Sequence, residues 1–379
     1  MPSIPGEITD IIIDHLHNDH PTLRSCSLTC RDWVASSRSH LFRVITLERA
    51  GDARRLQQLM TTSPGLAQYV RQLVISDPNV DSSWMAEILH LRPCFEQLEG
   101  LLLHRVNFLV PSTRNYFLLD AFTLTTLTIQ ECTIPANYLI RLLCTNTRLR
   151  NANILSNTIV QPVSNDAERR IGESCPLTSL RIRSFLGRYI KDAFSAIRTI
   201  DLPKIHHLSI PIMPIVIDIG DASQLLHSVG PSLRSLHLSI SCPSIVVDSL
   251  VADIGTNPFF SHLPLLQTLK LSFPPEIRSN TLPLLLSRIL SQVHSSSLKE
   301  LIIAARYRSH YSQWNDLDRV LTSPSFDGLR KFVLNLYFPP PASIGEMNNV
   351  ALAVRMGLSK VESRGILDFH VYQSSRIRS

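Results

Sequence analysis

The stretch LTTLTIQEC, residues 124–132, carries the pattern that governs how this chain folds. Apolar side chains stand at Leu124, Leu127 and Ile129, and polar side chains stand between and after them. Successive side chains of a β-strand point to opposite faces of a sheet. The spacing therefore predicts a short strand whose apolar residues face a core and whose polar residues lie on the other face.

The same six-residue phrase, apolar–x–x–apolar–x–apolar, recurs along the chain at intervals of 25–37 residues. Three apolar positions often match by chance in a chain that is 44% hydrophobic, so the spacing carries the inference. The phrases begin at Phe42, Val70, Leu98, Leu124, Leu149, Leu177, Ile205, Leu233, Leu266, Leu298, Leu329 and Ile366. Helical patterns fall between them, at 52–60, 83–91, 137–143, 282–290 and 348–356. The sequence thus predicts a stack of strand–turn–helix units.

This stack resembles the leucine-rich repeat, whose consensus L-x-x-L-x-L-x-x-N/C is visible in residues 124–132. The resemblance implies an α/β fold with a right-handed leucine-rich-repeat-like solenoid, its parallel strands on the concave face and its helices on the convex face. Cys132 and Asn157 fill the Asn/Cys position, which normally satisfies the backbone of the turn. Other repeats carry proline, phenylalanine or methionine there, so we expect an irregular array.

The polar positions of the central repeats hold a group of basic and histidine side chains. Parallel strands lie about 4.8 Å apart, so neighbouring repeats would gather this group within ~15 Å. Such a patch could pair with an acidic or phosphorylated segment. An ordinary solvated sheet face is the competing interpretation. The candidate substrate-binding residues are Arg181, Arg183, His207, His237 and Lys270.

Residues 4–42, IPGEITDIIIDHLHNDHPTLRSCSLTCRDWVASSRSHLF, form a separate pattern. A first helical stripe holds Ile8, Ile11, Ile12 and Leu16, and residues 18–21 break the helix. A second helical pattern places Leu23, Cys26, Cys30, Trp33 and Val34 on a common face. So short a segment cannot bury all of these side chains against itself. They must meet either the rest of the chain or another protein.

The order of these residues resembles the F-box, with its Leu-Pro-x-Glu start, first apolar helix, later Leu, Cys and Cys-Arg-x-Trp positions, and closing Leu-Phe. Ile4 replaces the usual first leucine, and Leu28 replaces a valine. The resemblance implies an all-helical F-box over 1–43 and a leucine-rich-repeat-like substrate-recognition domain over 44–379. It also implies a site for a Skp-type adaptor, made of Ile4, Pro5, Glu7, Ile8, Ile12, Leu16, Leu23, Cys26, Leu28, Cys30, Trp33, Leu41 and Phe42.

The leading hypothesis from this resemblance is a substrate-recognition subunit of an SCF-type (Skp–cullin–F-box) ubiquitin ligase. Through the adaptor it would join a cullin–RING scaffold, and through its repeats it would hold a protein substrate whose identity the sequence does not give. The alternative is an F-box protein that binds the adaptor without a ubiquitylation substrate, and an enzyme is a third hypothesis. No Walker, G-x-S-x-G, H-E-x-x-H or G-x-G-x-x-G motif occurs. We therefore expect no catalytic residue and no cofactor.

Composition and charge narrow the class of protein further. With 379 residues, 44% hydrophobic and 18% charged, the chain reads as folded. Its apolar runs are shorter than the ~20 residues that span a bilayer, and Glu7 and Asp10 stand where a secretory signal is basic. We expect an intracellular protein, in the cytoplasm, the nucleus or both, with no membrane partner. The net charge of +6 is spread along the chain, which argues against a nucleic-acid partner.

Two further groups of residues look like metal or disulfide sites at first sight. The seven cysteines are odd in number and scattered, with no C-x-x-C pair, so we expect buried thiols. The run HLHNDH, residues 15–20, falls at the break between the two helical patterns, and its spacing does not converge on one helical face. We expect no metal site there.

Overall fold

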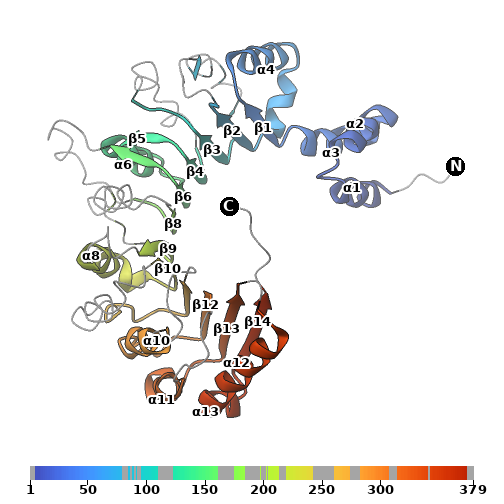
Figure 1. Ribbon diagram of the computed structural model, residues 1–379. Helices are drawn as coiled ribbons and strands as arrows, with labels where there is room; N and C mark the ends of the chain where they lie inside the picture. Colours follow the sequence, from blue (N-terminus) through green and yellow to red (C-terminus); the bar gives the residue numbers. More distant parts are fainter. Residues whose placement is uncertain are drawn as a thin grey trace. The chain divides into compact units, whose positions relative to one another are not determined.

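The computed structural model consists of two compact units, Met1–Asn165 and Asp166–Ser379, each with parallel strands flanked by helices (Figure 1). The predicted boundary after residue 43 falls inside the first unit. The structure describes residues 5–78, 84–85, 88, 91, 95–109, 123–160, 175–183, 197, 202, 204–212, 219–241, 260–273, 282–306, 314–339 and 342–373. Within these ranges, every helix is too short or too polar to cross a membrane.

The first unit begins with three helices, α1 (Gly6–His15), α2 (His20–Thr29) and α3 (Arg31–Leu41). Its sheet then follows the order β1 (Val44–Leu47), β2 (Gln72–Ser76), β3 (Gly100–His104), β4 (Thr126–Gln130) and β6 (Asn151–Leu155), all parallel. A smaller parallel pair consists of β5 (Thr133–Pro135) and β7 (Thr158–Val160). The helices between the strands include α4 (Ala50–Thr62), η1 (Pro64–Tyr69) and α6 (Ala136–Thr145).

The second unit repeats the same plan with longer strands. Its sheet follows the order β8 (Ser179–Arg183), β9 (His207–Ile212), β10 (Ser235–Ile240), β11 (Thr268–Phe273), β12 (Glu300–Arg306), β13 (Lys331–Phe338) and β14 (Leu367–Gln373), all parallel. Its described helices are α8 (Ile219–Val229), η5 (Gly230–Ser232), α10 (Leu282–Ser291), α11 (Asn315–Leu321), η7 (Pro324–Phe326), α12 (Ile344–Gly357) and α13 (Ser359–Ser363). Strand, turn and helix alternate, which is a leucine-rich-repeat-like architecture.

The strand phrase of the sequence is confirmed, because all twelve strands of these sheets begin one or two residues after the first apolar residue of a phrase. In β4, Leu127 and Ile129 are buried, while Thr126, Thr128 and Gln130 are partly exposed. A slip of one residue would move the two apolar side chains to the solvent face. The hydrophobic pattern therefore sets the register of each strand.

Helices cover one side of the strands, as Figure 1 shows for α8, α10 and α11 in the second unit. Four predicted helices are confirmed as α4, α6, α10 and α12, and the helix predicted at 83–91 lies largely outside the described residues. In α6, Leu139, Leu142 and Leu143 are buried at the i, i+3, i+4 spacing of one helix face. Each such side chain contributes about 1.5–3 kcal/mol when fully buried.

The turns after β3, β4 and β6 share one backbone conformation. Arg105, Glu131 and Ser156 each follow a strand and have φ of 58°, 54° and 55°, the left-handed region. The next residue in the last two turns is Cys132 or Asn157, the pair predicted to satisfy the turn backbone. Asn157 does so, because its side chain accepts from Cys132 N and donates to Ile129 O, both at 2.7 Å. That part of the repeat prediction is confirmed.

One prediction about the N-terminal segment is wrong. The second helical pattern, from Leu23 to Val34, is two helices, because Cys30 is extended with φ −151° and ψ 147°. It ends α2 and begins α3. Leu23 is buried, whereas Trp33 and Val34 are half-buried, so these residues do not share one face of a single helix.

The cysteine prediction holds in part. Cys26, Cys132 and Cys175 are buried, whereas Cys30 and Cys144 are only partly buried. Burial raises the pKa of Cys132 to about 12, so this thiol stays protonated and unreactive. Its Sγ lies 3.4 Å from Leu103 O and 3.3 Å from Gln130 O, and it accepts from Val106 N at 3.4 Å. Cys132 is therefore a packing and turn residue.

Candidate functional site

The first candidate site is the helical module at the N-terminus, in which α1 packs against α3 through polar side chains. Ser36 of α3 donates to the carboxylate of Asp10, and His40 Nε2 lies 2.7 Å from Asp14 Oδ1. Thr9 and Ile13 of α1 are buried. Because 9, 10, 13 and 14 form one face of a helix, this contact turns the opposite face outward.

The outward face of α1 is apolar. Ile8, Ile11 and Ile12 are 48%, 53% and 48% exposed, and we call these three residues the isoleucine stripe. On α2, Leu28 is 87% exposed, because it lies off the helix face that buries Leu23. The module therefore has a filled interior and still presents four large aliphatic side chains to solvent.

The histidine-rich run of residues 15–20 extends from the last residue of α1 through the connecting loop to the first residue of α2, at the break that the sequence predicts. Asp19 caps α2 by accepting from Thr22 N at 3.1 Å and Thr22 Oγ1 at 2.7 Å. Both hydrogen bonds lower the pKa of Asp19, and the one from the Thr22 side chain has the larger effect. In the described part of the chain, no three His, Cys, Asp or Glu side chains are grouped to hold a metal ion. The run acts as a helix connection.

The predicted adaptor-binding residues fall into three groups. Leu23 and Cys26 are buried inside the module, so they support its fold and cannot contact a partner directly. Ile4 lies outside the described residues. The others are exposed (Pro5, Glu7, Ile8, Ile12 and Leu28) or half-exposed (Leu16, Cys30, Trp33, Leu41 and Phe42). The predicted set omitted Ile11, although the helical spacing of 8, 11 and 12 already placed it with the other two isoleucines.

The second candidate site lies on the open face of the second unit's sheet. Arg181 of β8, Ser209 of β9, His237 of β10 and Lys270 of β11 are direct register partners across four neighbouring strands. We call this line of residues the basic row. Arg183 follows two residues after Arg181 on β8, so it lies on the same face.

His237 stands in the middle of the basic row and is held from both sides. Its Nδ1 lies 3.2 Å from Ser209 Oγ, and its Nε2 lies 2.9 Å from Ser272 Oγ. Burial, then the charges of Lys270, Arg183 and Arg181, lower the pKa of His237 to about 4. A neutral imidazole has one N–H donor and one acceptor, so it accepts from one serine and donates to the other.

The cations of the basic row have no anionic partner among the described residues. No hydrogen bond or ion pair joins Arg181, Arg183 or Lys270 to a carboxylate there. Burial, then the charge of Arg181, lower the pKa of Arg183. The predicted grouping therefore brings together Arg181, Arg183, His237 and Lys270. His207 is exposed and lies one register line away, beside Ser235 and Ser179.

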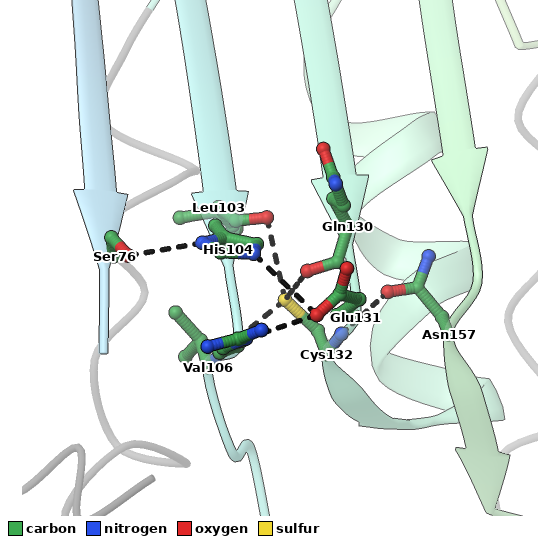
Figure 2. A network of polar contacts seen from close by, with 9 residues as sticks. Ser76, Leu103, His104, Val106, Gln130, Glu131, Cys132 and Asn157 are labelled. Carbon is green, nitrogen blue, oxygen red and sulfur yellow. Dashed lines mark hydrogen bonds and ion pairs between the residues drawn. The ribbon is translucent and has the colours of Figure 1, made fainter. Parts of the chain in front are cut away.

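A third polar group, which the sequence reasoning did not single out, joins the ends of β2, β3 and β4 (Figure 2). Ser76 Oγ lies 3.0 Å from His104 Nδ1, His104 Nε2 lies 3.6 Å from Glu131 Oε2, and Arg105 donates to the same oxygen at 2.9 Å. The hydrogen bond from Arg105 holds the pKa of Glu131 below its usual range. Ser76 and His104 each directly follow the six-residue phrase of adjacent repeats, and this spacing could have located the pair.

A serine, a histidine and a carboxylate in a line also occur in hydrolases, so the geometry of this group matters. At 3.6 Å the carboxylate is too far from the imidazole for a hydrogen bond, and it bonds Arg105 instead. Catalysis by a serine needs a base that is itself oriented by a hydrogen bond. The contacts of Ser76, His104 and Glu131 tie three strand ends together and lack that arrangement.

Comparison with known proteins gives a fold likeness only. No family model and no curated protein matches the sequence. The chain is similar to a chain in the crystal structure of the TLR13–ssRNA13 complex, at 13% identity and a TM-score of 0.43. The likeness covers 90% of this chain and 45% of that chain, so this chain spans less than half the length of its match. A likeness this weak carries nothing about ligand or partner.

Proposed function

We propose that this chain is a substrate-recognition subunit of an SCF-type ubiquitin ligase. Its N-terminal helical module binds a Skp-type adaptor, and the adaptor joins it to a cullin–RING scaffold. Its repeats bind a protein substrate. The chain itself performs no chemistry: it raises the concentration of the substrate near the transferable ubiquitin.

The exposed isoleucine stripe is the observation that carries this proposal. Ile8, Ile11 and Ile12 present their side chains to solvent from one helix, although the same module buries Ile13 and Leu23 at 1% and 0% exposure. Contact with an apolar partner surface would remove this area from water and stabilise the complex by roughly 25 cal/mol per Å² of apolar surface buried. We take the adaptor as that partner because the order of residues in this segment resembles the F-box.

Polar contacts hold the stripe in place for binding. The links from α3 to Asp10 and Asp14, together with the burial of Ile13, favour the rotation of α1 that keeps its isoleucines outward. Leu28 on α2 and the half-exposed Trp33 on α3 extend the apolar side chains to all three helices. A partner would meet a surface that is largely formed beforehand, which lowers the entropic cost of binding.

The test is an Ile8→Asp, Ile11→Asp double variant of the full chain, assayed against purified Skp-type adaptor. Placing charge in an apolar contact costs several kcal/mol, so the adaptor Kd should rise by at least ~100-fold. The matched control is Ile344→Asp, the same substitution at an isoleucine of α12 that is exposed in the second unit. It should leave adaptor binding unchanged.

Two results would count against the proposal. Wild-type affinity in the double variant would show that α1 is not the adaptor site. Adaptor binding by the wild type without recovery of cullin from cells would leave the adaptor contact in place and remove the ligase role. Thermal melts of all variants distinguish loss of binding from loss of fold.

A further inference from the structure

The basic row has a charge pattern that is extended in space. Lys270 stands at one end, and Arg181 with Arg183 stands at the other, three strand steps away. At about 4.8 Å per step, the two ends are roughly 14 Å apart. This is the separation of the strand backbones, and a single phosphate or carboxylate is much smaller than it. One compact anion would reach both ends only if the long side chains of Lys270 and Arg181 both lay over His237.

The middle of the row is polar and uncharged. His237 is neutral near pH 7, and its two ring nitrogens are already engaged by Ser209 and Ser272. The serine hydroxyls retain hydrogen-bonding capacity for a ligand, because each hydroxyl has one donor and two acceptor sites. An anion is therefore favoured at the two ends and a neutral polar group between them.

An extended peptide matches these dimensions. It advances about 3.3–3.4 Å per residue, so roughly four residues separate two side chains that are 14 Å apart. The arginine end carries two guanidinium groups on alternate residues of β8, and guanidinium matches the planar carboxylate in a two-point contact. Nucleic acid fits less well, because single strands bind by stacking bases on aromatic side chains, and the row's only ring is the half-buried imidazole of His237.

We infer that the basic row binds an extended acidic segment of a partner protein, lying across β8 to β11 with two carboxylates about four residues apart. The inference rests on the proposed function only in taking that partner to be the ubiquitylation substrate. Isolated surface ion pairs are worth about 0–1 kcal/mol, so the paired spacing, rather than any single contact, gives the selectivity. Binding should weaken as salt rises.

The experiment uses the full chain and bead-bound 12-residue peptides made of glycine, serine and threonine. Each peptide carries two glutamates, with the second one to six positions after the first. We expect the four-position spacing to bind at least about fivefold more tightly than adjacent glutamates. The Lys270→Glu variant should remove this preference. Further probes are a peptide with one phosphoserine and a single-stranded oligonucleotide.

The matched control is Lys331→Glu on β13, which removes an exposed lysine of the same unit outside the row, where it pairs with Asp368 at 3.9 Å. It should keep the spacing preference. The inference is overturned by equal binding at all spacings, by no binding, by equal loss in the control, or by tighter binding of the phosphoserine peptide or the oligonucleotide. Adaptor binding, measured on the same variants, should stay at wild-type level and reports separately on the N-terminal module.

Discussion

Single residues determine how neighbouring repeats join. Asn157 accepts from the backbone N–H of Cys132 and donates to the carbonyl of Ile129, so one amide satisfies two buried main-chain groups of the preceding repeat. Its position could be predicted from the leucine-rich-repeat consensus. The left-handed φ at Ser156 and Glu131 could not be predicted, because glycine is the usual signal for that conformation and neither residue is a glycine.

Asn157→Ala should destabilise the first unit. The substitution leaves Cys132 N and Ile129 O buried without partners, at about 1–3 kcal/mol for each orphaned group. Chemical denaturation measures the loss of unfolding free energy. The control is Asn153→Ala on the sheet face, where the side chain is half-exposed and donates to Thr128 Oγ1 at 3.1 Å. Equal losses in the two variants would contradict the assigned role.

His237 should make stability depend on pH. Its folded pKa of about 4 lies below the ordinary 6.5, so the unfolded chain binds more protons between these values. The stability from neutral His237 is fully present above about pH 6.5 and is lost as pH falls toward 4. The groups that face it are Arg181 and Arg183 of β8 and Lys270 of β11.

The measurement compares wild type with His237→Gln, which keeps a polar side chain and removes the titration. Between pH 7 and pH 5, the wild type should lose more unfolding free energy than the variant. Parallel pH profiles for the two proteins would mean that His237 titrates normally in the folded state.

Elements, in contrast, are determined by patterns over many residues. The strands were predictable because phrase spacing and apolar alternation agree at each one, as in LTTLTIQEC. The break at Cys30 was not predictable, because its neighbours include no glycine or proline and the apolar spacing across it is that of one continuous helix. The helical periodicity predicted which isoleucines share a face of α1, but it did not predict that Asp10 and Asp14 pair with side chains of α3.

Helix α12 offers a test of element packing with two glycines. A Cβ on Gly357 would lie 2.5 Å from Trp314 Cβ, whereas a Cβ on Gly345 would meet nothing closer than Ser343 Oγ at 3.9 Å. Gly357→Ala should therefore destabilise the second unit, typically by 1–3 kcal/mol. Gly345→Ala should be neutral or stabilising by up to ~1 kcal/mol. Thermal melts check both, and an unharmed Gly357→Ala would mean that α12 is not seated on Trp314.

At the scale of the whole molecule, each repeat is stabilised by its contacts with the repeats on either side. In the second unit, β10 and β11 each lie between two strands, whereas β14 pairs with β13 alone among the described strands. Its Leu367, Phe369 and Val371 are only half-buried, unlike the corresponding residues of β10. Stability in such arrays is a sum of repeat and interface terms, so the end strand opens more easily.

Hydrogen exchange followed by mass spectrometry should detect this gradient. Amides of β14 should exchange at least ~10-fold faster than those of β10 and β11 under native conditions. The strands of the first unit are followed in the same experiment. Equal protection of β14 and β10 would imply that another part of the chain covers the outer edge of β14.

The candidate sites were predictable to different degrees. Strand register placed Arg181, His237 and Lys270 on one face from the sequence, because alternation is strict over each strand. The half-burial of His237 depends on Ser209 and Ser272, which belong to other repeats, so it needed the three-dimensional pairing. The sequence supplied the F-box resemblance, but the direction of the isoleucine stripe came from helix packing.

The burial of Trp314 has an optical consequence. Its ring is fully buried, and its indole nitrogen has no hydrogen-bond partner among the described atoms, so its fluorescence should be strongly blue-shifted. Trp33, half-exposed on α3, should emit at longer wavelength. The chain has three tryptophans, so replacing Trp84 with phenylalanine leaves one fluorophore in the N-terminal helices and one in the last repeats. Emission at the longer wavelength then follows changes around the N-terminal helices, such as the proposed binding of an adaptor. Emission at the shorter wavelength follows unfolding of the last repeats in the same sample.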